Sequence, residues 1–224
     1  MQPALDKDEI VSNILRLAIA AIKQTNKNAV FSGPMSEDWH YFSILNSVHA
    51  GELVIKAIIA EEHPLLIFRD LFSLYKDDAE LTLQQLMLQG KSHDLSKLPQ
   101  VLWAVTGQRI ASKEIFKKAL LVRNTIQHFL SPKNTDLGHI ALEFLYTIVD
   151  PLLADNFGIF AIEYHDNPDD YGYLVERLIH HEIKFSMPKD FGLESLEADG
   201  KGALENSSNE YREWFKKELL RAEK

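Results

Sequence analysis

The residues best suited to chemistry lie in the apolar stretch "LLVRNTIQHFL", at positions 120–130. Its middle holds Arg123, Asn124, Gln127 and His128, although arginine is rarely buried without a partner. Arginine stays charged and binds phosphate through paired hydrogen bonds. Histidine gives and takes protons near neutral pH, and asparagine can orient an imidazole or a phosphate oxygen. Together these side chains suit attack of an RNA 2′-hydroxyl on its adjacent phosphate, without a metal.

Helix geometry decides which of these side chains share a face, because successive residues are about 100° apart. Asn124 and His128 share one face, Arg123 and Gln127 share a neighbouring one, and Arg123 lies about 140° from His128. A second copy of the helix, crossing the first, would bring two arginines and two histidines into one cleft. The alternative interpretation is structural: a histidine near a helix C-terminus interacts favourably with the dipole, beside an arginine that extends to solvent.

Composition is that of a globular protein with a substantial core, since 46% of the 224 residues are apolar. Such a length fits one large domain or one domain with additions.

The absence of cysteine excludes disulfides and thiolate chemistry and suits a reducing compartment. The N-terminus lacks the basic start and apolar core of a secretory signal. No run of about 18 uncharged apolar residues is present. We therefore expect a cytoplasmic protein without a membrane partner.

Charge is unevenly distributed along the chain. The net charge of −9 argues against a protein that coats nucleic acid without specificity, and no DNA partner is expected. Residues 89–133, however, contain eight basic and two acidic residues, including Lys117 and Lys118. This basic segment contains the Arg123–His128 stretch. It predicts either an anionic substrate nearby or simply a solvated helix face with clustered lysines.

The dominant apolar period is helical, which predicts an all-α fold. We expect a helical connection from Pro64 to about Tyr75 and a short helix around Pro99 that this proline interrupts. We also expect an irregular piece over 157–172 with room for a short strand, and a flexible linker over 196–209. Residues 1–156 should form an antiparallel helical bundle, and residues 157–224 a mostly helical C-terminal extension of unknown role. The longer helices are expected over 6–26, 36–62, 79–88, 112–130, 135–156, 173–182 and 209–222. Ser112 is expected to cap the helix over 112–130.

Three segments resemble the HEPN domains (higher eukaryotes and prokaryotes nucleotide-binding). "RNTIQH" at 123–128 matches their Arg–polar–x–x–x–His signature. "SVHAGELVIKAIIAEEHPLLIF" at 47–68 resembles their helix with a small-residue–Glu–Leu–x–x–Lys–Ala pattern. "KSHDLSKL" at 91–98 is similar to a His–Asp–Leu–x–x–Leu segment often found between those two helices. The three occur in the family's order and cover about residues 36–156.

The resemblance implies a helical bundle that dimerises so that the signature helices of two subunits meet at a composite cleft. Many HEPN members are metal-independent, cofactor-free endoribonucleases of toxin–antitoxin, abortive-infection or CRISPR-linked defence. Arg123 and His128 would then be the catalytic pair, supported by Asn124 and Gln127, with an antitoxin or defence-system partner. One toxin subgroup carries a modifiable tyrosine two positions after the histidine, where this chain has Leu130. Other members are non-catalytic modules that bind nucleotide, RNA or protein, and this is the alternative function.

Other polar groups receive mainly structural interpretations. Glu52 and Lys56, four apart, predict a helix-surface ion pair, with a cleft or substrate contact as the alternative, as for Lys117 and Lys118. Asp94 is expected to cap a helix, and a cleft role for His93 is the alternative. The clusters "YHDNPDD" at 164–170 and "HHE" at 180–182 lack metal-site spacing, so no metal site is expected. Core or interface positions, rather than base-stacking platforms, are expected for the tryptophans, which are Trp39, Trp103 and Trp214.

Overall fold

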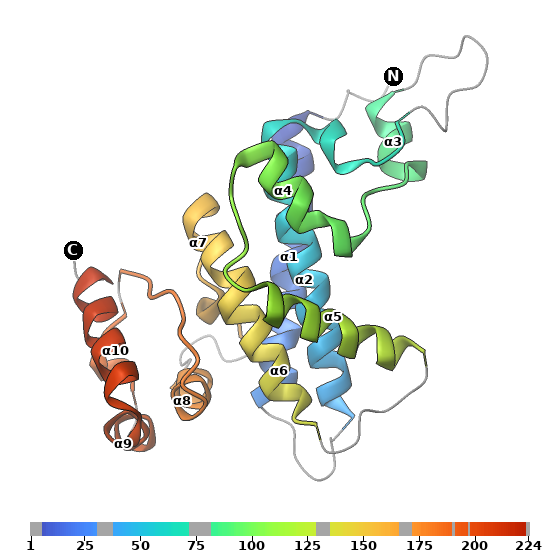
Figure 1. Cartoon of the computed structure of the whole chain (residues 1–224). Coiled ribbons are helices and arrows are strands. Elements are labelled where there is room, and N and C mark those ends of the chain that lie inside the picture. The colour runs from blue at the N-terminus through green and yellow to red at the C-terminus, as the bar shows by residue number, and fades with distance from the viewer. Residues whose placement is uncertain are drawn as a thin grey trace. The chain divides into compact units, whose positions relative to one another are not determined.

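The computed structural model describes residues 6–30, 38–71, 82–128, 135–165, 172–189, 191–196 and 198–222. Within these ranges the regular elements are helices, and the β geometry consists of one isolated antiparallel bridge between Phe68 and Ser92. The predicted all-α fold is therefore confirmed (Figure 1).

Fifteen helical elements follow one another in the described part of the chain. Most are α-helices; η1, η2, η4 and η5 are 3₁₀ turns, and η3 is a π-helical turn. They are α1 (Lys7–Val30), α2 (Trp39–Glu62), η1 (Pro64–Ile67), α3 (Leu83–Gln89), η2 (Leu95–Lys97), α4 (Leu98–Thr106), α5 (Lys113–Gln127), α6 (Leu137–Phe144), η3 (Leu145–Val149), α7 (Asp150–Phe157), η4 (Ala161–Glu163), α8 (Gly172–His180), η5 (Leu193–Ser195), α9 (Ala198–Asn206) and α10 (Asn209–Ala222).

The chain divides into two compact units, and both α1 and α2 contribute to each. The first unit comprises Met1–Ala18 and Glu52–Ile110, and the second comprises Ile19–Gly51 and Ala111–Lys224. The predicted division between residues 156 and 157 stays a prediction. The units separate the candidate residues: Glu52 and Lys56 belong to the first, whereas the Arg123–His128 stretch belongs to the second.

In the first unit, the segment after α2 differs from the expected helical connection. Pro64 begins η1, but the backbone is already extended at Phe68, because this residue pairs with Ser92. Residues 72–75 of the expected connection lie outside the described residues. Pro99 does not interrupt a helix as predicted. It stands in the first turn of α4, where its missing N–H has no helical partner to lose.

A single buried rod of α6, η3 and α7 dominates the second unit and confirms the long helix expected over 135–156. Asp136 begins it by accepting a hydrogen bond from the His139 N–H at 2.8 Å. The rod widens into a π-turn just before Pro151, whose ring cannot follow a regular α-helical turn. Gly51 of α2 lets the rod approach closely, since a Cβ there would lie 2.8 Å from the Phe144 ring.

Helix α5 begins at the predicted cap, where the Ser112 hydroxyl accepts a hydrogen bond from the Ile115 N–H at 3.3 Å. It buries Phe116 and Ala119 and packs beside α6. The helix ends at His128, whose backbone N–H bonds to the Asn124 carbonyl at 3.0 Å. The predicted continuation to Leu130 lies outside the described residues. The inner face of α5 is therefore fixed near its start, and its outer face reaches solvent.

The predicted flexible linker over 196–209 is wrong, because residues 198–206 form α9 and pack on α8. Gly200 and Ala203 are buried there, and small residues allow two helices to approach closely. Glu182 holds the start of α10: its carboxylate accepts hydrogen bonds from the Ser208 N–H and hydroxyl, both at 2.7 Å. Residues 157–165 contain η4 rather than the suggested strand, and residues 166–171 lie outside the described part.

Buried polar groups attach the irregular segments to the rod. Asn26 accepts a hydrogen bond from the Tyr146 hydroxyl at 3.0 Å and donates to the carbonyls of Ala161 and Tyr164. Asp150, fully buried, accepts hydrogen bonds from the backbone N–H groups of Ala161 at 2.9 Å and Ser186 at 2.6 Å. Burial raises the pKa of Asp150 to about 6, although both hydrogen bonds favour its ionised form.

Two helical stretches, Trp39–Glu62 and Leu137–Phe157, are long and apolar enough to cross a membrane by length and composition. Most of each stretch is buried inside the fold, as in the core helices of soluble proteins, which satisfy the same criteria. These helices therefore carry weak evidence about the compartment, and the cytoplasmic location stays a prediction.

The Asp150 carboxyl generates a pH-dependent prediction. Its folded-state pKa of about 6 exceeds the ordinary 3.8, so the folded protein binds this proton at higher pH than the unfolded chain does. Lowering the pH from 7 to 4 should therefore raise the free energy of unfolding of the wild type relative to Asp150→Asn, by about 3 kcal/mol at most. Urea unfolding at several pH values measures this difference. Parallel pH profiles for the two proteins would contradict the prediction.

Candidate functional site

The Arg123–His128 stretch lies at the end of α5 in the second unit, with Arg123, Asn124 and Gln127 inside the helix and His128 directly after it. Arg123 and Asn124 are half-buried, whereas Gln127 and His128 are exposed. Arg123 follows the buried Phe116 by seven residues, which places its Cα within about 20° of the packed face. His128 lies on the outer face at the helix end. None of the four side chains is enclosed in the core, so the group is accessible to a ligand.

Asn124 connects the two faces of α5. It lies between Arg123 and His128 around the helix axis, about 40° from the histidine. The Arg123 guanidinium donates a hydrogen bond to the Asn124 Oδ1 at 3.0 Å, so the arginine bends from the packed face toward the histidine side. This contact places the Asn124 amide beside the guanidinium, and a supporting role for Asn124 stays a prediction. The part of the guanidinium not bonded to Asn124 retains donors for a phosphate.

The two candidate lysines differ in their surroundings. Lys117 is exposed on the outer face of α5, one turn before Leu121. Lys118 instead forms an ion pair with Glu143 of α6 at 2.8 Å, which favours a structural role for it. Leu121 is 69% exposed and precedes His128 by seven residues, so both lie on the same outer face. The outer face of α5 thus combines a histidine, a lysine and an uncovered leucine.

Glu52 and Lys56 form the expected ion pair in the first unit, at 2.5 Å. The Lys56 ammonium also donates a hydrogen bond to the Ser92 hydroxyl at 2.9 Å, and its side chain is only 13% exposed. Two of the three segments that resemble HEPN domains, 47–68 and 91–98, are therefore in direct contact. The contacts are those of a packed, structural pair, and the alternative cleft role stays a prediction.

The predicted side-chain cap by Asp94 is wrong. Asp94 occupies the position before η2 but makes no capping hydrogen bond with its side chain. Its carboxylate instead accepts a hydrogen bond from the Arg69 guanidinium at 2.8 Å. The Arg69 N–H bonds to the Lys91 carbonyl and thereby holds the guanidinium close to Asp94. The carboxylate thus pairs with a guanidinium instead of accepting a hydrogen bond from the first turn of η2. His93 contributes its backbone N–H to Ile67, and its cleft role stays a prediction.

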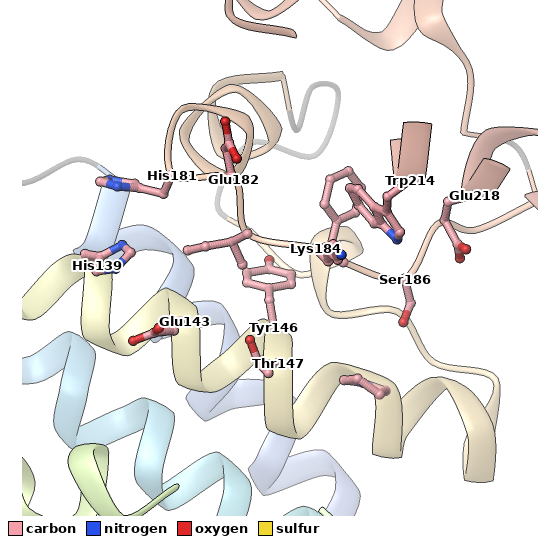
Figure 2. Close-up of a pocket in the computed structure, with 13 residues that line it drawn as sticks. His139, Glu143, Tyr146, Thr147, His181, Glu182, Lys184, Ser186, Trp214 and Glu218 are labelled. Atoms are coloured by element: carbon pink, nitrogen blue, oxygen red, sulfur yellow. The ribbon is translucent and has the colours of Figure 1, made fainter. Parts of the chain in front are cut away.

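Sequence reasoning missed a pocket of about 450 Å³ in the second unit (Figure 2). One wall is the rod of α6, η3 and α7, the second is the segment after α8, and the third is α10. The polar and aromatic lining residues include His139, Glu143, Tyr146, Thr147, His181, Glu182, Lys184, Ser186, Trp214 and Glu218. These residues come from three separated elements that meet only in the folded chain, so sequence carried no signal for the pocket.

Two histidines meet at one end of this pocket. The rings of His139 and His181 lie 4.5 Å apart between centroids, and His139 Nδ1 and His181 Nε2 are buried without a hydrogen-bond partner in the described part of the chain. Burial, Arg177 and His139 together lower the pKa of His181, against the opposing charge of Asp136. The "HHE" segment thus places one histidine in a ring contact. The described residues contain no group of three or more potential metal ligands, and Asp166 and Asp169 lie outside them.

Comparison with known proteins adds no relative: no family model matches the chain, and no curated protein or solved structure is significantly similar to it. The resemblance to HEPN domains consequently rests on the three sequence segments alone.

The His139–His181 contact predicts an acid-sensitive element. The folded-state pKa of His181 is below its ordinary value, so the unfolded chain binds this proton more tightly. The contribution of His181 to stability is therefore complete above about pH 6.5 and is lost as the pH falls below that value. His181→Gln, neutral at every pH, should lose less stability than wild type between pH 7 and pH 5 in thermal unfolding. The matched control is His180→Gln, since the neighbouring His180 side chain is 56% exposed. Equal behaviour of both variants would exclude the His181 contribution.

Proposed function

We propose that this protein is a metal-independent endoribonuclease of the HEPN type, acting as a homodimer, and a toxin or antiviral-defence effector. The observation that carries the proposal is the arrangement on α5. A half-buried arginine is held by Asn124 at 3.0 Å, and an exposed histidine lies one turn further on. The chemistry of these groups fits a phosphodiester, because the guanidinium binds phosphate and the imidazole transfers protons.

The proposed reaction is an internal transesterification of RNA. His128 of one subunit takes the proton from a 2′-hydroxyl, whose oxygen forms a bond to the adjacent phosphorus. The bond from phosphorus to the 5′-oxygen breaks, and that oxygen receives a proton from the second imidazole or from water. Arg123 stabilises the additional negative charge on the phosphorus centre. The products are a 2′,3′-cyclic phosphate and a 5′-hydroxyl, and no metal or cofactor is consumed.

Helix geometry supports a composite site made by two subunits. Arg123 and His128 lie about 140° apart on α5, so one helix directs them to different sides. In a dimer, two crossing α5 helices would place the arginine of one subunit beside the histidine of the other. Leu121, exposed on the histidine face, offers an apolar contact for the second subunit. The neutralising partner of such an effector would cover the same face.

Cleavage of RNA in EDTA tests the proposal. Arg123→Ala and His128→Ala should each lower the initial rate by about 10²- to 10⁴-fold, the usual contribution of a positioned acid–base group or charge. The measurement is cleavage of a labelled single-stranded RNA, with cyclic-phosphate ends identified by mass spectrometry. Lys113→Ala is the control, since this lysine lies at the start of the same helix, away from the motif. Unchanged rates in both folded motif variants would refute the enzyme, leaving the non-catalytic binding module.

Mixing the two inactive variants tests the composite site directly. Arg123→Ala and His128→Ala subunits, unfolded together and refolded, form mixed dimers in which one arginine and one histidine remain. If these groups act across the interface, part of the lost activity should return, whereas either variant alone stays inactive. No recovery, with mixed dimers demonstrated by native mass spectrometry, would contradict the pairing of groups from two subunits.

A further inference from the structure

The outer face of α4, in the first unit, carries an exposed tryptophan that the RNase motif does not use. Trp103 is 52% exposed, which contradicts a core position for this residue. Gln100 and Trp103 are three residues apart on α4 and so lie on neighbouring parts of one face, and Lys97 immediately precedes the helix. This face therefore combines an amide, an indole and an ammonium group, all accessible to solvent.

Arg109 lies over the indole of Trp103, with its guanidinium carbon 5.1 Å from the ring centroid. The turn between them is well fixed. Gly107 has a φ of 75°, which glycine adopts without strain, and its N–H bonds to the Trp103 carbonyl at 2.9 Å. The Thr106 hydroxyl donates to the Leu102 carbonyl and accepts from the Gln108 N–H. The arginine is thus positioned by the backbone as well as by its contact with the ring.

The charge around this pair favours an anionic ligand. Residues 95–110 contain two basic residues, Lys97 and Arg109, and no aspartate or glutamate. The preceding carboxylate, Asp94, is already bonded to Arg69. In the described part of the chain no ion pair involves Arg109. A guanidinium that rests on an indole without a carboxylate partner retains its donors for phosphate.

We propose that Trp103 and Arg109, with Lys97 and Gln100 beside them, form a binding surface for single-stranded RNA. One unpaired base stacks on the indole, and the guanidinium binds the adjacent phosphate. A base inside a duplex is already stacked on its neighbours, so the surface selects single strands or loops. The inference deepens the proposed function, because it names the structural class of the RNA that the α5 motif would cleave.

RNA binding separates the contributions of the two side chains. The assay uses the full chain carrying His128→Ala, so that the RNA stays intact, and fluorescence anisotropy with a labelled 12-nucleotide single strand. Adding Trp103→Ala should weaken binding by about 5- to 100-fold, the usual effect of one stacking residue, without changing the salt dependence. Adding Arg109→Ala should reduce the slope of log K against log salt by about 0.7, as expected for one lost phosphate contact on a single strand.

Control variants distinguish loss of base stacking on Trp103 from a general effect of removing a tryptophan. Trp103→Phe should retain most of the binding, and Trp39→Ala, which removes a tryptophan 40% exposed on α2, should retain all of it. Binding of a perfectly paired duplex should not respond to Trp103→Ala. If Trp103→Ala does not fold, as judged by circular dichroism, the proposal is tested by whether Arg109→Ala changes the salt dependence of the binding constant. The proposed RNA-binding surface would be refuted if Trp103→Ala and Arg109→Ala both bound the single strand as tightly as the parent. It would also be refuted if Trp39→Ala weakened binding as much as Trp103→Ala does. A protein ligand would then be sought for this face.

Failure of this inference is distinguishable from failure of the proposed catalysis. If the chain with His128 intact cuts no RNA while single-strand binding depends on Trp103, the catalytic proposal fails and the surface stands. If the chain cuts RNA through Arg123 and His128 while binding ignores both α4 residues, the surface fails and the catalytic proposal stands.

Discussion

The second unit depends on a buried carboxylate that cannot be solvated and must be hydrogen-bonded. Asp150 faces the backbone N–H groups of Ala161 and Ser186, one on each oxygen, so two irregular segments are fixed to the rod through one side chain. Asn26 does the same for η4 from the side of α1. An uncompensated charge in this place would cost several kcal/mol. The C-terminal segments therefore lie where these polar groups require, and the pocket between the rod, the segment after α8 and α10 follows from it.

At the candidate site the decisive constraint is the angular spacing of a helix. Arg123 and His128 are five positions apart, and no side-chain rotamer removes the resulting angle of about 140° between their Cα positions. The Arg123–Asn124 hydrogen bond reduces the separation by turning the guanidinium, but the imidazole remains on the outer face. The α5 motif is thus accessible in one chain and is completed, in the proposed enzyme, by its symmetric copy. The proposed RNA-binding surface of Trp103 and Arg109 belongs to the first unit, and each subunit of the proposed dimer would carry one such surface.

Sequence predicted the features that follow from local patterns. Apolar periodicity located the helices α1, α2, α5, α8 and α10 and the long rod, and Ser112 was correctly identified as a cap. Sequence failed where a distant partner decides the outcome. Asp94 bonds to Arg69 instead of capping, and the polar, glycine-containing segment 198–206 folds into α9 because α8 offers it a surface. The pocket and the His139–His181 contact were unpredictable for the same reason, since their residues meet only in three dimensions. The Arg123–His128 stretch was identifiable because its residues are neighbours on one helix.

The π-turn at η3 has a consequence for the shape of the pocket wall. His139, Glu143, Thr147 and Pro151 follow one another at intervals of four, and all four line the pocket. In a regular α-helix each such step rotates the side chain by about 40°, so the last would face roughly 120° away from the first. The wider π-turn holds more residues than an α-helical turn and offsets part of this rotation. The extra residue within the turn thereby brings these four side chains closer to one line along the rod, so the shape of this wall depends on the π-turn as well as on the residues that line it.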